Sequence, residues 1–206
     1  MGVRIRKKWD LLSEQSVALA VLSTAFLLGG GLGCLFAALA GETDRAELGS
    51  YLTRYLSLAR EGQLPRELWP LLWGQLKYAL LALVLSLTAL GVVGLPVLFG
   101  VRGFFFSFSV ACFCRVFGGQ GLFPAFVLFG LSALLWASAL FMVGIPGLLS
   151  ARQQLRRALG DGRGGWSVGA AYWCRAGACV GLSLAAGLLE YWVVPVLLRG
   201  LVRTML

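Results

Sequence analysis

The sequence predicts an all-α fold: a polytopic helical membrane protein with about five transmembrane spans and one outer amphipathic helix. Of its 206 residues, 59% are hydrophobic and 13% are charged, whereas about 25% are charged in an ordinary soluble domain. Residues 78–151 contain no acidic side chain, and Arg102 and Arg115 are their only charges. A soluble core of that length would show polar residues at helical or strand spacing, whereas a bilayer-spanning helix is apolar over about 20 residues.

One integral membrane domain, residues 1–206, accounts for the whole chain. We expect its spans at residues 16–39, 71–93, 103–117, 122–149 and 168–189. The first apolar run far exceeds the core of a cleaved signal peptide, so we interpret it as an uncleaved span although Ala38-Leu39-Ala40 resembles a cleavage site. Gly29-x3-Gly33 in the first span and Gly177-x3-Gly181 in the last predict faces for close helix packing. We expect the last helix to bend near Pro195.

The basic residues indicate which ends of the spans face the cytoplasm. They form two clusters, Arg4, Arg6, Lys7 and Lys8 before the first span, and Arg152, Arg156, Arg157 and Arg163 in the connector 150–165. Such clusters beside spans mark the cytoplasmic side and the anionic leaflet. The pattern therefore predicts a multi-pass protein of the plasma membrane with a cytoplasmic N-terminus. The same placement makes nucleic-acid binding the weaker interpretation of the net charge of +9.

The segment 41–68 mixes five acidic residues with four arginines and fits the outer side of the membrane. Within it, apolar residues recur at helical spacing, which predicts an amphipathic helix. The stripe that we expect to bind a partner consists of Leu48, Tyr51, Leu52 and Tyr55. Two interpretations stand: the helix lies on the membrane or on the protein's own outer surface, or it receives an extracytoplasmic partner.

A helix break is predicted at Gly94 and Pro96, because glycine and proline together disfavour a continuous hydrogen-bond ladder. Arg102 follows, and we expect it to reach the headgroup level where the chain returns to the cytoplasmic face. A third, rather short span then begins at Gly103.

The sequence gives no sign of catalysis or of a bound cofactor. It contains no histidine, hence no imidazole base, and no phosphate-binding loop of the nucleotide-hydrolase type. Its five cysteines lie in apolar segments at spacings that match no strong zinc pattern. Lys77, Arg115 and Glu190 lie near expected span boundaries, where their side chains can extend to the interface. Arg175 lies deeper, and both a structural role and a lipid or partner contact stay open for it.

The block from Leu90 to Arg157 resembles the stage II sporulation protein M family. The matching features are Gly94-Leu95-Pro96, Arg102-Gly103 opening a Phe-rich span, the glycine-rich turn through Gly121, a long apolar span and a basic exit. A basic N-terminus, one span and an outer amphipathic loop precede this block in the family's order. The resemblance implies a polytopic scaffold that recruits two peptidoglycan-degrading proteins at the septal membrane during engulfment. The family has no catalytic residues to carry over.

Two functions therefore follow from the sequence. The first is a non-enzymatic membrane scaffold for cell-wall remodelling, with the lipid bilayer and extracytoplasmic peptidoglycan hydrolases as partners. The alternative is the membrane subunit of a transporter or exporter, because interrupted helices near mid-chain are also what transporters use to build substrate sites. Assembly with further copies of the chain stays open.

Overall fold

The computed structural model describes the backbone of residues 2–41, 67–160 and 170–205, together with residues 47, 49–50, 54 and 57–58. This part of the chain is all-α and contains five helices long and apolar enough to cross a membrane, at Glu14–Leu39, Leu68–Ser86, Gly91–Phe117, Phe126–Ala158 and Tyr172–Leu197. The predicted fold class is confirmed. The chain is thus a multi-pass membrane protein.

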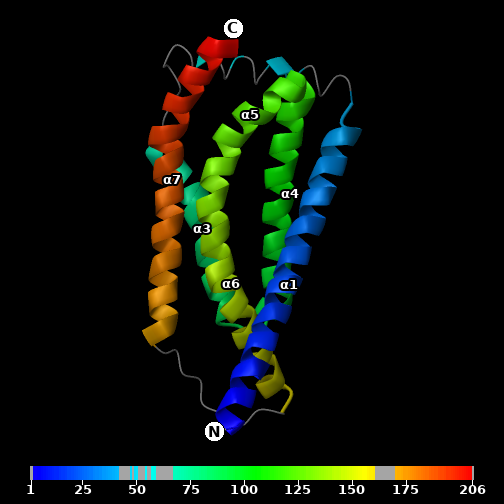
Figure 1. Ribbon diagram of the computed structural model, residues 1–206, viewed down its shortest axis with the longest axis vertical. Helices are drawn as coiled ribbons and strands as arrows, with labels where there is room; N and C mark the ends of the chain where they lie inside the picture. Colours follow the sequence, from blue (N-terminus) through cyan, green and yellow to red (C-terminus); the bar gives the residue numbers. More distant parts are fainter. Residues whose placement is uncertain are drawn as a thin grey trace.

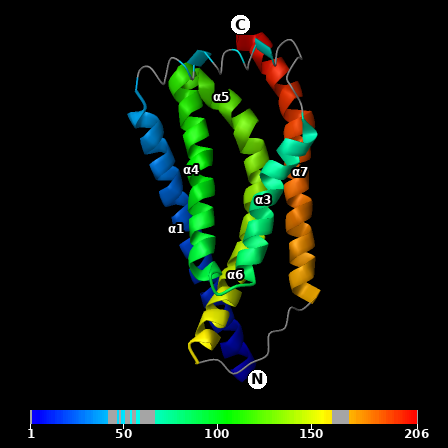
Figure 2. The same ribbon diagram turned by 180° about the vertical axis from the view of Figure 1, so that it is seen from behind.

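The helices run up and down in one bundle, with the N- and C-termini at opposite ends, as an odd number of crossings requires (Figures 1 and 2). The elements in order are α1 (Gly2–Leu39), α3 (Leu68–Ser86), α4 (Gly91–Phe117), the short helices η1 (Gly118–Gly121), α5 (Leu122–Ala125) and η2 (Phe126–Gly130), then α6 (Leu131–Ala158) and α7 (Ala170–Met205). Helix α6 contacts α1, α3, α4 and α7. It therefore joins the α1–α4 pair to the α3–α7 pair.

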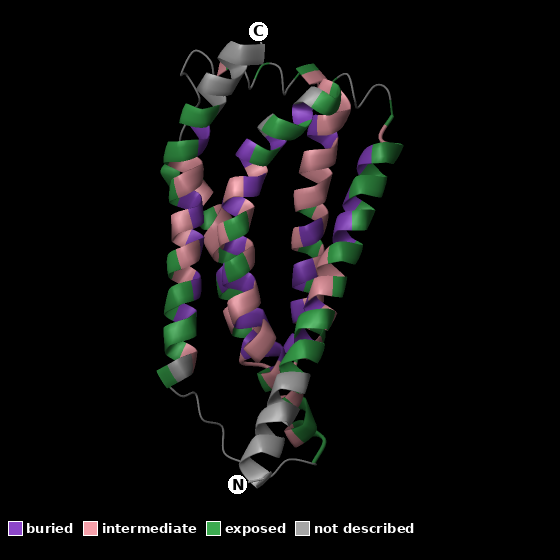
Figure 3. Ribbon diagram, viewed as in Figure 1, coloured by how far each residue is buried: buried purple, intermediate pink, exposed green. Residues whose placement is uncertain are grey.

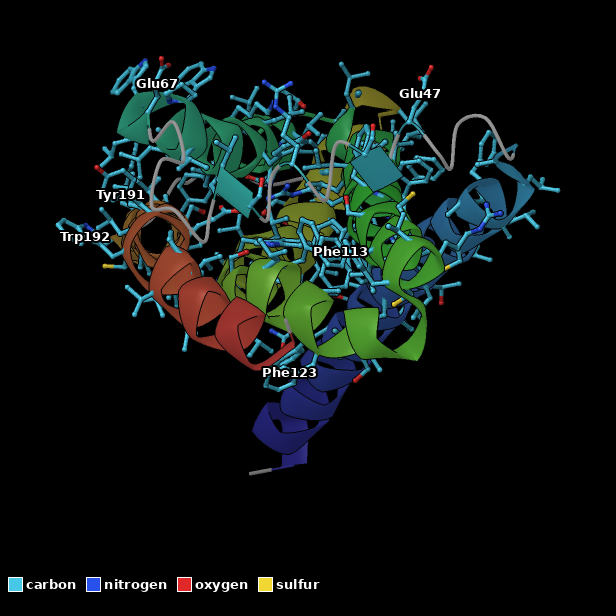
Figure 4. The ribbon with its side chains drawn as sticks, turned by 90° about the horizontal axis from the view of Figure 1, so that it is seen from above. Glu47, Glu67, Phe113, Phe123, Tyr191 and Trp192 are labelled. Carbon is cyan, nitrogen blue, oxygen red and sulfur yellow. The ribbon has the colours of Figure 1, made fainter. Side chains whose placement is uncertain are left out.

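Burial follows the inward faces of the helices, whereas their outward faces are apolar and exposed (Figure 3). Viewed along the bundle, Phe113 lies among the helices, while Phe123 and Trp192 lie at the surface (Figure 4). Their side chains are 1%, 62% and 65% exposed, respectively. A soluble protein seldom exposes large apolar side chains along whole helices, so these faces are the ones that contact lipid.

Glycines allow α1 and α4 to pack with their backbones almost touching. A Cβ atom on Gly29 would lie 2.0 Å from the carbonyl oxygen of Gly100, and one on Gly33 would lie 2.4 Å from that of Phe104. On the facing helix, a Cβ atom on Gly103 would lie 2.2 Å from the oxygen of Phe26. The predicted close-packing face at Gly29 and Gly33 is confirmed.

The corresponding prediction for the last span is wrong. Among the described residues, no atom of another element lies within 4 Å of where a Cβ of Gly177 or Gly181 would be, and both glycines are exposed. The spacing of small residues indicates that one face of a helix allows a close contact. Whether another helix covers that face depends on the rest of the bundle. In α7 that face points away from the other helices.

The chain reverses between α3 and α4 at residues 87–90, so the predicted break at Gly94 and Pro96 is wrong. Both residues lie inside α4, where Pro96 removes one hydrogen bond in the second turn while its fixed φ suits a helix. The reversal depends instead on Gly91, whose Cβ would lie 2.1 Å from the carbonyl oxygen of Leu85. As a result, the second span ends at Ser86 rather than at residue 93, and the third begins at Gly91 rather than at residue 103.

The later elements extend beyond their expected ends. The glycine-rich turn is the 3₁₀ helix η1, with Gly118 at a φ of 64°, and Pro124 lies in the first turn of the following helix. Through the π-helical turn η2, this segment runs into α6, which continues past Pro146 and nine residues into the expected connector 150–165. Helix α7 likewise continues past residue 189 and through Pro195 to Met205.

Replacing Gly29 by alanine should destabilise the bundle, because the added methyl group would meet the backbone of α4 rather than a flexible side chain. We expect the free energy of unfolding to fall by about 1–3 kcal/mol. The measurement is unfolding in mixed detergent micelles, followed by tryptophan fluorescence.

The matched control is Gly31→Ala in the same helix, because no described atom of another element lies within 4 Å of where its Cβ would be. Alanine there should be neutral or slightly stabilising, since it favours the helix over glycine. Equal effects of the two substitutions would contradict the close α1–α4 contact.

Candidate functional site

The predicted partner-binding residues Leu48, Tyr51, Leu52 and Tyr55 lie outside the residues that the structure describes. Around them, residues 47, 49–50, 54 and 57–58 are helical. A Cβ on Gly49 would lie 3.6 Å from a methyl group of Val116, near the end of α4. This part of the segment 41–68 therefore lies against the end of the bundle at which α4 finishes.

Arg102 lies well inside α4, whereas the sequence pattern predicts it just before a span, at the headgroup level. It is the eleventh residue after the start of α4 at Gly91, which places its Cα about 16 Å along the helix. The hydrocarbon core is about 30 Å thick, so a helix that enters the core at Gly91 would carry Arg102 to about its middle. The sequence interpretation placed Arg102 at the surface because it started the third span too late.

Two aromatic rings enclose the guanidinium group of Arg102. Its Cζ lies 4.2 Å from the ring centre of Tyr78 in α3 and 4.2 Å from the ring centre of Trp136 in α6. The faces of these rings carry negative electrostatic potential and attract a cation, most strongly where water is excluded. Trp136 is held in turn by Phe26 of α1 and Phe106 of α4, with ring centres 6.3 and 6.2 Å away.

A chain of hydrogen bonds connects Arg102 to an acidic residue on the far side of α3. Nη2 of Arg102 donates to Oε1 of Gln75 at 2.5 Å, and Nε2 of Gln75 donates to Oε2 of Glu190 in α7 at 3.1 Å. Gln75 therefore uses both ends of its amide and bridges a cation and an anion. We call Gln75, Tyr78, Arg102, Trp136 and Glu190 the Arg102 network.

The Arg102 network holds α3, α4, α6 and α7 together, because the charge of Arg102 needs polar or aromatic partners and these come from several helices. An ionised group near mid-membrane costs several kcal/mol unless protein groups replace its hydration. The aromatic faces and the amide oxygen do so here, and Glu190 supplies the opposite charge across Gln75. The Nε atom of Arg102 is buried without a hydrogen-bond partner among the described residues. The network thus holds the charge but leaves one donor unused.

A second arginine, Arg115, fixes the end of α1. Its Nη1 atom donates to the carbonyl oxygens of Ala37 and Ala40, the latter at 3.2 Å. The last carbonyls of a helix lack partners within the helix and carry partial negative charge. A cation from α4 therefore satisfies them and ties the two helices together where the segment 41–68 begins.

The remaining charged and sulfur-bearing side chains form no reactive cluster within the part of the chain that the structure describes. Arg175 is exposed on α7, and all five cysteines are free. Among the described residues, no group of three or more His, Cys, Asp or Glu side chains could hold a metal ion. The charged side chains of the described residues can therefore hold helices or a partner in place through electrostatic interactions.

The fold and the Arg102 network define a polytopic helical membrane protein with a polar cluster inside its bundle. No family model, no curated protein and no solved structure matches the chain in comparison. What the protein does must therefore be argued from its own residues.

Part of the Arg102 network was readable from the sequence. Gln75 and Tyr78 are three residues apart in an apolar span, so they share one helix face. A side-chain amide inside a span is a polar group that needs a partner. Glu190 was interpreted as a boundary residue, and its link to Gln75 spans 115 positions, which no local spacing indicates.

Substituting Glu190 alone by leucine should destabilise the bundle more than replacing all three hydrogen-bonded residues, Gln75, Arg102 and Glu190, with apolar ones. The single change leaves the Arg102 charge without its counter-charge, and breaking a buried pair in this way costs about 3–5 kcal/mol. The triple variant Gln75→Leu, Arg102→Met, Glu190→Leu should regain most of that loss. Chemical unfolding in micelles measures both.

Arg175→Met is the control, because Arg175 is an exposed cation in the same helix as Glu190. The stability of this variant should stay close to that of the natural chain. If Glu190→Leu is as harmless as this control, Glu190 does not compensate the charge of Arg102.

Proposed function

We propose that the chain is a non-enzymatic scaffold of the plasma membrane that holds peptidoglycan-degrading partners at the outer surface. The observation that carries the proposal is the pair of hydrogen bonds from Arg115 to Ala37 and Ala40. They fix the end of α1 to α4, so the segment 41–68 leaves the bundle from a rigid point. A scaffold needs a firmly held docking segment more than it needs a reactive group.

Four further points support a scaffold. The chain contains no histidine, and the described side chains form no metal-binding cluster. The Arg102 network connects four helices into one unit. The resemblance to the stage II sporulation protein M family suggests engulfment during sporulation as the process. The basic clusters suggest a cytoplasmic N-terminus, which puts the segment 41–68 outside, where the cell wall is.

Capture of partners tests the proposal directly. The purified chain, immobilised in detergent, is incubated with solubilised membranes of its own organism, and the bound fraction is run on a gel containing peptidoglycan. We expect cleared bands from bound hydrolases. Tyr51→Ser with Tyr55→Ser should weaken these bands severalfold, because serine removes the apolar area that a partner groove would cover.

Ser57→Ala is the matched control: the Ser57 hydroxyl donates to the carbonyl oxygen of Arg54 within its own turn, so its loss should leave capture unchanged. Bands no stronger than those from empty resin would contradict the scaffold. A double tyrosine variant that captures normally would remove the stripe from the proposal, and one that disappears from the membrane would show the stripe packing on the protein's own spans.

A transporter subunit is the second candidate, and the depth of the Arg102 network favours it. Transporters place paired charges near mid-membrane, and Arg102 with Glu190 forms such an arrangement through Gln75. The same captured fraction separates the two functions. ATP hydrolysis in that fraction, without peptidoglycan cleavage, supports export rather than scaffolding.

Cysteine labelling tests the proposed orientation. With the five native cysteines replaced by alanine, Ser50→Cys should react with a membrane-impermeant maleimide in intact cells, because Ser50 is exposed. Arg156→Cys, exposed at the other end of the bundle, should react only after permeabilisation. The reverse pattern would overturn the orientation and, with it, an outer docking segment.

A further inference from the structure

Helix α3 carries a continuous outward face that no other described element covers. The face consists of Trp69, Trp73, Lys77, Leu81 and Val84, all exposed. Their spacing of four, four, four and three residues places them on one side of a helix. Figure 2 shows α3 on the side of the bundle that faces the viewer. We call this surface the α3 outer face.

Lys77 lies at the centre of the α3 outer face and at the centre of the span. Nine residues of α3 precede it and nine follow it, so its Cα is about 14 Å from either end of the helix. A lysine at the centre of a transmembrane helix costs about 2.5–3.5 kcal/mol on insertion scales. An exposed charge at this depth calls for a partner group.

The chain's own described residues do not neutralise Lys77. Its ammonium lies 5.1 Å from the ring centre of Tyr78, but Arg102 already occupies a position 4.2 Å from the same ring centre. No described carboxylate forms an ion pair with Lys77, and Glu190 is bonded to Gln75. Two cations therefore share one aromatic ring, and the exposed one has no counter-charge among the described residues.

We propose that the α3 outer face receives a membrane-spanning helix of another protein that carries an aspartate or glutamate near mid-span. A carboxylate at that depth would compensate the Lys77 charge where the dielectric constant is low. Gly74 has open space where a Cβ would be, so a helix can approach α3 closely beside Lys77. The length of α3 suits an occupant that runs along it through the bilayer.

A second copy of the chain is a poor occupant of this face. In a two-fold contact, the same residue of each copy lies at the same depth, so two Lys77 ammonium groups would face each other. Their repulsion is strong in hydrocarbon. The charge thus selects a partner of opposite sign. This inference rests on the α3 outer face and the charge of Lys77, and does not depend on the proposed scaffold function.

The test uses two synthetic transmembrane peptides of leucine and alanine, one with a single central glutamate and a twin with leucine there. The purified full chain is reconstituted with each peptide in phosphatidylcholine vesicles, and association is measured by Förster transfer between dyes on the chain and on the peptide. The glutamate peptide should bind about fivefold more tightly or better. Lys77→Met should remove this preference, and Lys77→Glu should transfer it to a peptide with a central lysine.

Arg175→Met is the control, because it removes an exposed cation from α7 and should leave the preference intact. Equal binding of the two peptides, or a preference that survives Lys77→Met, overturns the proposal in favour of a lysine that only extends to the interface. A preference that appears only after anionic phospholipid is added overturns it in favour of a lipid headgroup. Transfer between labelled copies of the chain that falls on Lys77→Met overturns it in favour of self-association.

Discussion

The positive charge of Arg102 inside an apolar bundle is the constraint on which the arrangement of the helices depends. A guanidinium group close to mid-membrane needs several partners at once, and no single helix of this chain supplies them. Helix α3 gives Tyr78 and the amide of Gln75, α6 gives Trp136, and α7 gives the distant counter-charge of Glu190. Satisfying the charge therefore requires α3, α4, α6 and α7 to assemble in one orientation, which apolar packing alone specifies less strictly.

Helix α1 is held to the bundle in a different way. Its Phe26 ring packs against Trp136, and its closest attachment is the backbone contact that Gly29 and Gly33 make with α4, where Gly103 lies. Arg115 then secures its end. The Arg102 network among four helices and the glycine contact of the fifth helix together give a rigid frame. Such a frame suits a protein that presents a segment or a helix face to partners, which is the role that we propose.

The number of spans was predictable because apolar runs of this length occur in few structures besides membrane-spanning helices. Gly29-x3-Gly33 was predictable because backbone contact in a membrane requires small residues. The α3–α4 reversal was misplaced because several glycines and a proline lie close together, and only the contact between Gly91 and Leu85 decides which of them turns the chain. The Arg102 network was missed for two reasons. The misplaced α3–α4 reversal put Arg102 at the membrane surface. In addition, the hydrogen-bond partner of Arg102, Gln75, lies 27 positions away in the sequence, on another helix.

The depth of Arg102 is the most direct test of this account. A nitroxide spin label on Val101, which is 40% exposed and adjacent to Arg102, reports that depth through its relative accessibility to oxygen and to a water-soluble nickel complex. A label on Leu90, 76% exposed just before α4, is the shallow reference. We predict that the Val101 label lies more than about 10 Å inside the hydrocarbon core, where oxygen is abundant and nickel is scarce. A Val101 label at the same depth as the Leu90 label would place Arg102 at the headgroups and contradict the account.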